Sequence, residues 1–160
     1  GYWLLLVCRL CICLVIAAQV SYDLRLTVTD EIRCREDEQK TQQLLERLAG
    51  ADGGELQRLP VVFVGYQEAD LPEWCRRTAF YGWDYSMENP TGTTHRICGF
   101  VQAYTGNVLR EDATEEQKRH AVELAGQMKD FPEEGSVLVT EDCVVVRLSE
   151  VKEQMPTDWW

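Results

Sequence analysis

The side chains best suited to chemistry in this chain are one cysteine–histidine pair and several neighbouring carboxylates. His95 and Cys98 lie three positions apart, so on a helix they share one face. A Cys–His nucleophile also needs a third group that orients the histidine, and no such group is identifiable here. Acidic neighbours such as Asp84 and Glu88 are too common to indicate general acid–base catalysis. We therefore predict no catalytic residue in this chain.

The sequence also lacks complete motifs for binding a metal or a cofactor. His95 and Cys98 have the spacing of half a zinc site, but no second pair of ligands completes it. The sequence has no P-loop, no G-x-G-x-x-G loop and no G-x-S-x-G elbow. Its seven cysteines are odd in number and scattered, which does not predict a disulfide framework, although a single bond such as Cys75–Cys98 stays open. We predict no metal and no cofactor.

The aromatic-rich residues 66–94 and the loop that follows residues 61–64 are the candidate binding segments. Sugar rings stack on aromatic side chains, and sugar hydroxyls bond to carboxylates. We name Trp83, Asp84 and Tyr85 as candidate glycan contacts because both kinds of group are adjacent here. The alternative, which we favour, is that these rings close the hydrophobic core over a sheet. Exposure of the two rings would favour the sugar, and burial of both would favour the core.

Charge and composition exclude other classes of function. The chain carries 16 Lys and Arg residues against 27 Asp and Glu residues, for a net charge of −11. Nucleic-acid binding depends on clustered basic residues that displace counterions, so we exclude a nucleic-acid partner. The acidic balance also argues against tight docking on anionic lipid headgroups. Hydrophobic residues make up 45% of the chain, which is enough to bury a core.

Residues 2–20 form an apolar run that is interrupted by Arg9 and, near its end, by Gln19. As a helix this run is about 28 Å long at about 1.5 Å per residue, close to the roughly 30 Å of a bilayer's hydrocarbon core. We predict a transmembrane-like helix over residues 1–22. Aromatic residues that can anchor its two ends at the interfaces are Tyr2, Trp3 and Tyr22.

Two other interpretations of this run are a signal peptide and a buried core helix. A signal peptide has a basic start and a small-residue cleavage site, whereas this run starts with Gly-Tyr-Trp and its Ala-Ala-Gln end is a poor signal. Arg9 would cost about 3 kcal/mol in mid-membrane, unless neighbouring helices offset the cost. We therefore expect the chain to be a piece of a longer protein with further membrane helices upstream.

The remaining residues predict an α/β domain over 23–155, followed by a tail over 156–160. Apolar periodicity and capping residues predict helices over residues 30–48, 94–105 and 114–129. Runs of β-branched residues predict strands over residues 61–64, 136–140 and 143–148. Helices alternating with strands favour a small three- or four-stranded sheet packed with helices.

Local signals refine this prediction. Thr114 and Gln117 form a capping-box pattern, and Thr93 or Thr94 can cap the helix that Gly106 ends. The last two strands form a hairpin. Four consecutive apolar residues need cover on both faces, so we predict residues 61–64 as a central strand flanked by that hairpin.

This layout resembles the C-terminal end of the type II O-antigen glucosyltransferase family of bacteria. The resemblance covers most of the chain as a diffuse pattern in which no single motif is diagnostic. The segments that carry it are residues 29–37, 44–48, 59–65, 96–100, 106, 128–137 and 143–149.

The resemblance implies a role and a location. Members are multi-pass membrane proteins thought to move glucose from a lipid-linked donor onto surface polysaccharide. This chain would be an accessory domain outside the bacterial cytoplasmic membrane, tethered by the last transmembrane helix. Its partners would be upstream helices of the same parent chain and a surface glycan or lipid-linked sugar. The family's catalytic acidic residues would lie upstream, and none matches a position here. The alternative is a membrane-tethered binding or interaction module without enzymatic activity.

Overall fold

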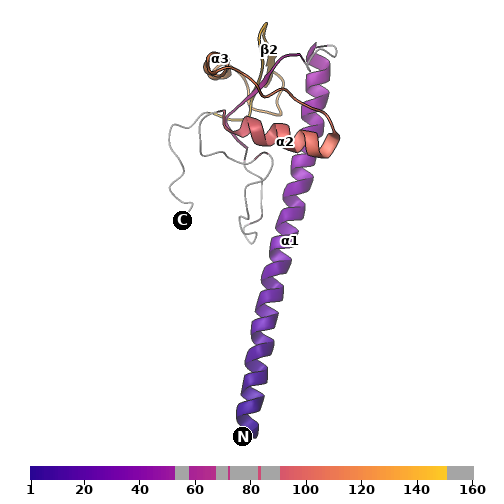
Figure 1. The fold of residues 1–160 in the computed structure, drawn as a ribbon, viewed down its shortest axis with the longest axis vertical. Helices are drawn as coiled ribbons and strands as arrows, with labels where there is room; N and C mark the ends of the chain where they lie inside the picture. Colours follow the sequence, from indigo (N-terminus) through magenta and orange to yellow (C-terminus); the bar gives the residue numbers. More distant parts are fainter. Residues whose placement is uncertain (53–57, 68–71, 73–82, 84–90, 151–160) are drawn as a thin grey trace. The chain divides into compact units, whose positions relative to one another are not determined.

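The computed structural model describes residues 1–52, 58–67, 72, 83 and 91–150. Within these residues it has three helices and one three-stranded mixed sheet, with the long apolar helix at the N-terminal side (Figure 1). The predicted fold class, a small α/β sheet preceded by a hydrophobic helix, is confirmed. The chain divides into two compact units, residues 1–35 with 70–79 and residues 36–69 with 80–160. The predicted domain boundaries stay a prediction, and the tail lies outside the described residues.

Helix α1 runs continuously over Tyr2–Asp52, a length of 51 residues. The sequence predicts separate helices over residues 1–22 and 30–48, so this prediction is wrong in placing a break between them. The physical reason is that neither proline nor glycine occurs between Gly1 and Gly50. Without either residue, nothing in the backbone interrupts helical hydrogen bonding at the junction.

The sheet contains β1 (Val61–Val64), β2 (Val137–Val139) and β3 (Val144–Arg147), in the order β1-β3-β2. Strands β1 and β3 are parallel, and β2 is antiparallel to β3. The predicted hairpin is therefore confirmed. The prediction that β1 is central is wrong, because β3 occupies the centre of the described sheet and β1 lies at one edge.

The outer edge of β1 is nevertheless covered. The backbone N–H of Phe63 donates to the Thr94 hydroxyl at 3.1 Å, and the Thr93 hydroxyl donates to the Gly65 carbonyl at 2.9 Å. The first amide of the strand donates to the Arg110 carbonyl at 2.7 Å. Side chains and a loop thus take the place of a neighbouring strand. Apolarity predicts burial but does not distinguish this protected edge from a central position.

Helix α2 spans Thr93–Thr105 and ends at Gly106, whose φ of 75° is left-handed, as the sequence predicts. Its N-cap is Gly92, which makes no side-chain capping bond. The prediction that Thr93 or Thr94 caps this helix is therefore wrong. Both hydroxyls bond to the edge of β1 instead, since an unpaired amide inside the fold is costly.

Helix α3 spans Glu115–Ala125, and the predicted capping box of Thr114 and Gln117 is confirmed by reciprocal bonds of 3.2 and 2.8 Å. The helix ends before the predicted limit at Lys129. The guanidinium of Arg147 donates to two carbonyls at this end, at 2.7 and 2.6 Å. These bonds satisfy backbone groups that a longer helix would have paired internally.

The hydrophobic core lies on both faces of the sheet. Alternate residues of β1 point to opposite faces, so Phe63 belongs to one cluster and Val62 to the other. The first cluster includes residues of α1 and α2, namely Leu44, Leu48, Ile97 and Val101. The second includes residues of α3, namely Ala121 and Ala125. The helices therefore cover both faces of β1, which explains why all four of its residues are buried.

Candidate functional site

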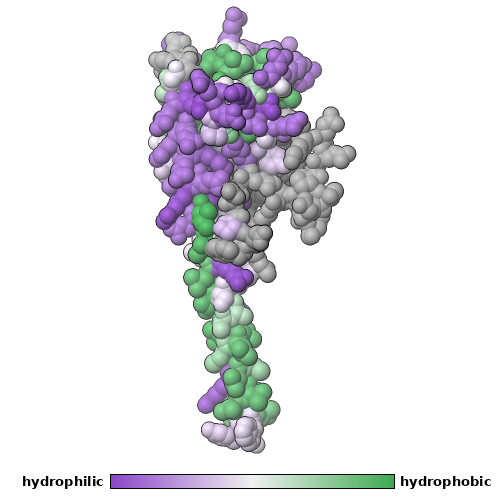
Figure 2. All heavy atoms as spheres, turned by 180° about the vertical axis from the view of Figure 1, so that it is seen from behind, coloured by the Kyte–Doolittle hydropathy of each residue, from purple (hydrophilic) through white to green (hydrophobic). Residues whose placement is uncertain are grey.

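The first candidate site is the N-terminal part of α1. Its large hydrophobic side chains from Tyr2 to Leu24 are exposed, and Figure 2 shows hydrophobic residues over this part of the helix. An 18-residue window here has a mean hydropathy of 2.4 and no buried residue. By length and composition, α1 is the one helix among the described residues that can cross a membrane. No residue of this window is buried within the chain, which argues against a core helix, whereas a signal peptide would meet the same length and composition criteria.

Polar side chains at the end of this apolar stretch bond within the helix. The hydroxyl of Ser21 donates to the Ala17 carbonyl at 2.8 Å, and the hydroxyl of Thr27 donates to the Asp23 carbonyl at 2.9 Å. Such bonds satisfy a hydroxyl without water, which a bilayer requires. A serine or threonine inside a helix is the sequence signal for such a bond.

The predicted glycan contacts centre on Trp83, and its indole is fully buried. The ring stacks on Phe131 with centroids 5.4 Å apart and meets Phe63 edge-on at 6.0 Å. Its Nε1–H donates to the Thr41 hydroxyl at 3.2 Å. Trp83 therefore offers no accessible face to a sugar and acts as a core residue. The other two predicted contacts, Asp84 and Tyr85, lie outside the described residues.

The cysteine–histidine pair does not assemble into a nucleophilic site. His95 is exposed and its Nδ1 lies 2.8 Å from Glu111, whereas Cys98 is buried. Burial, with a smaller effect from Glu111, raises the pKa of the Cys98 thiol to about 12. A thiol with this pKa stays protonated at neutral pH and is a poor nucleophile. Cys98 is thus a small buried side chain of the core.

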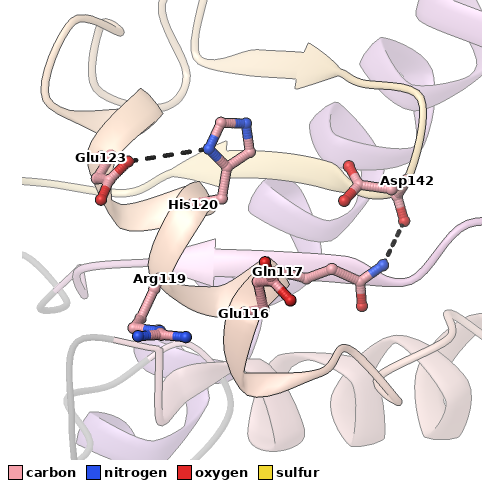
Figure 3. A pocket seen from close by; sticks show the side chains of 6 residues that line it. All are labelled: Glu116, Gln117, Arg119, His120, Glu123 and Asp142. Carbon is pink, nitrogen blue, oxygen red and sulfur yellow. Dashed lines mark hydrogen bonds and ion pairs between the residues drawn. The ribbon is translucent and has the colours of Figure 1, made fainter.

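A hollow lined by polar side chains lies between α3 and the hairpin turn (Figure 3). Its volume is about 430 Å³. The Gln117 side chain donates to the Asp142 carbonyl at 2.9 Å, and His120 lies 3.9 Å from Glu123. The residues that line the hollow are Glu116, Gln117, Arg119, His120, Glu123 and Asp142.

The chemistry of this hollow is that of a solvated polar surface. A bond from the Thr140 hydroxyl lowers the pKa of Asp142, which keeps that carboxylate ionised rather than poised as an acid. Among the described residues, no three His, Cys, Asp or Glu side chains gather as metal ligands. His120 is exposed, and nothing in the sequence indicates that Asp142 lies beside it. Only the hairpin turn brings the two segments together.

The carboxyl ends of the parallel strands β1 and β3 are a common place for ligands in α/β sheets. Here they are joined tightly. Gly65 has a φ of 84°, and a Cβ at this position would lie 2.6 Å from the Ser149 carbonyl oxygen. The Ser149 side chain in turn accepts the amide of Tyr66 at 3.2 Å. The close contact leaves no space for a ligand between these two residues.

Comparison of the chain with known protein families, with curated proteins and with solved structures found no match. The class of protein is therefore defined by fold alone. It is a small α/β unit whose first helix extends into an exposed apolar segment able to cross a membrane.

Proposed function

We propose that this chain is a membrane-tethered binding module without enzymatic activity of its own. The observation that carries the proposal is the exposed apolar segment of α1, which continues without a break into the helix that packs on the sheet. Exposed apolar surface of this extent is typical of a membrane or protein interaction site. The described carboxyl groups with a shifted pKa, Asp112, Glu115 and Asp142, are all shifted downward by hydrogen bonds to neighbouring side chains, so none of them is held protonated as a general acid.

Membrane fractionation tests this proposal. We expect the full chain to stay in the membrane pellet through alkaline carbonate extraction, because about 20 apolar residues suffice to span a bilayer. The double substitution of Leu10 and Leu14 by arginine should release it, since each arginine costs about 3 kcal/mol at the helix centre. Substitution of the same two leucines by isoleucine is the matched control. Carbonate release of the unchanged chain, or loss of residues 1–20 from the mature protein, would refute the proposal.

A narrower candidate function is the accessory domain of a membrane glucosyltransferase, and Arg9 favours it. This arginine is exposed within the apolar segment. A cation at that depth is stabilised by polar groups on adjacent membrane helices. On this proposal the parent protein supplies those helices, and the α/β unit lies outside the bacterial cytoplasmic membrane.

Two measurements test the narrower candidate. In a Cys75→Ser background, a membrane-impermeant maleimide should label the exposed Cys34 in intact cells, with Cys34→Ser in the same background as the control. Arg9→Leu should weaken association with the parent helices if Arg9 pairs with them, and should strengthen membrane retention if it has no partner there. Labelling only after cell lysis, together with tighter retention of Arg9→Leu, would contradict the glucosyltransferase candidate while leaving the tethered module intact.

A further inference from the structure

The two edges of the sheet differ in how their backbone groups are paired. The edge of β1 is closed by the α2 threonines and by the Arg110 carbonyl. At the other edge, β2 is bonded to β3 on one side only. Edge strands usually carry a protecting feature such as a proline, a lysine or a bulge. Strand β2 has the sequence Val-Leu-Val and contains none of these.

The register of the hairpin shows which backbone groups of β2 face outward. The Ser136 carbonyl accepts the amide of Arg147 at 2.9 Å, and the Thr140 amide donates to the Cys143 carbonyl at 2.9 Å. Hydrogen-bonded and non-hydrogen-bonded residue pairs alternate along two antiparallel strands. The backbone N–H and C=O groups of Leu138 therefore also face β3. The two valines of β2 therefore turn both their N–H and C=O groups away from the sheet.

These outward groups are free within the described part of the chain. No bond from the backbone of Val137 or Val139 reaches another described residue outside the strand ladder. Between them, the side chain of Leu138 is 39% exposed. An added strand would pair with the backbone of both valines and would bring an apolar side chain against this leucine.

The charges at the two ends of β2 determine which kind of partner strand can pair with its open edge. Both ends of β2 are acidic and exposed, with Glu133 and Glu134 before it and Glu141 and Asp142 after it. A second copy paired antiparallel about the centre of β2 would place the acidic end of one chain beside the acidic end of the other. Like charges in that position oppose pairing, as does the net charge of −11. A segment with basic residues at its two ends would instead be attracted to the acidic residues at both ends of β2.

We propose that the edge of β2 binds an extended segment of a partner protein that has an apolar centre and basic residues at both ends. The segment adds a fourth strand to the described sheet, with backbone bonds to Val137 and Val139. The inference rests on the proposed binding function by naming its partner class. It does not depend on the membrane anchor, so failure of the fractionation test and failure of peptide binding are distinguishable.

The test uses the full 160-residue chain in detergent micelles and a fluorescent peptide. The peptide has roughly seven residues, alternating valine and threonine between terminal lysines, which matches an ordinary strand length. We expect the same peptide with terminal glutamates to bind at least about tenfold more weakly. We expect a similar loss of affinity when the backbone of the lysine peptide is N-methylated. Amide exchange at Val139 should slow when the lysine peptide is added, with Leu138 unchanged.

Variants of the protein locate the binding edge. Val139→Pro removes an outward amide but no bond to β3, so it should weaken lysine-peptide binding at least about tenfold. Val139→Thr keeps the amide and serves as the control. If the proline variant fails to fold, the double substitution Glu134→Lys and Glu141→Lys replaces it and should reverse the preference between the two peptides.

Three results would overturn the inference. The first is equal binding, or no binding, of the lysine and glutamate peptides. The second is full binding by a folded Val139→Pro variant. The third is a concentration-dependent dimer in sedimentation that Val139→Pro abolishes, which would assign the edge to a second copy of this chain.

Discussion

Replacing Trp83 by alanine tests whether this residue is a core residue rather than a sugar contact. The indole is fully buried between Phe63 and Phe131 and bonds to the Thr41 hydroxyl. Removal of a buried tryptophan costs about 3–5 kcal/mol, a large part of the roughly 5–15 kcal/mol by which domains are stable. We expect the urea midpoint of the full chain in detergent to fall accordingly, and the melting temperature to fall by more than about 10 °C.

The hydrogen bond gives a sharper version of the same test. Trp83→Phe keeps an aromatic ring but leaves the Thr41 hydroxyl without its partner, at a cost of about 1–3 kcal/mol. Thr41→Val in the phenylalanine background should recover part of that loss. A double-mutant cycle over the two sites should therefore give a coupling free energy of about 1 kcal/mol.

The assay is urea unfolding followed by near-ultraviolet circular dichroism, which reports the packing of the buried rings. A stability change below about 0.5 kcal/mol for Trp83→Ala, the level of a surface substitution, would refute the core assignment. A coupling near zero would show that the bond to Thr41 contributes nothing. Only the first outcome would make Trp83 a candidate for ligand contact again.

Three further predictions concern the sheet and the buried thiol. Gly65→Ala should destabilise the fold by more than about 1 kcal/mol, because the new Cβ would lie 2.6 Å from a backbone oxygen at a positive φ; Gly99→Ala, with open space, should be neutral or stabilising. Thr94→Val should cost about 1–3 kcal/mol by leaving a buried amide unpaired. Cys98 should resist iodoacetamide near pH 8 while Cys34 reacts. The pKa of the Cys98 thiol is about 12 in the folded chain and 9.0 ordinarily. The contribution of this buried thiol to the free energy of unfolding should therefore decrease as the pH rises from 9 toward 12.

Each of these predictions has a contradicting result. Equal melting temperatures for Gly65→Ala and Gly99→Ala would show that the joint between the strand ends is not tight. Thr94→Ser keeps the hydroxyl and should match the unchanged chain, so a loss equal to that of Thr94→Val would point to packing rather than hydrogen bonding. Mass spectrometry that finds Cys98 and Cys34 alkylated at one rate would show that Cys98 is accessible.

Elements whose signals are local could be predicted from the sequence. The capping box of Thr114 and Gln117 is complete within four consecutive positions, so it identifies the start of α3 without reference to the rest of the fold. The same holds for Gly106 at the end of α2. The predicted end of α3 overlooked Gly126, which is the C-cap; only the bonds from Arg147 to the carbonyls at this end depend on a distant strand.

The same distinction between local signals and distant contacts applies to the residues of the candidate site. Burial of Cys98 follows from its place on the apolar face of a helix. The role of Trp83 does not, since an aromatic residue next to a carboxylate is equally compatible with a sugar contact and with a core position. Thr41 and Phe131 decide the matter, and both are distant in sequence.

The two sheet edges show why sequence pattern alone could not locate the proposed binding surface. Strands β1 and β2 are both short and rich in valine, and nothing in either run says which edge is closed. Closure of β1 depends on Thr94, which is 31 positions from the amide it accepts. No comparable residue among those described reaches β2. An open edge is therefore defined by what distant segments do not supply, and it becomes visible only once the fold is known.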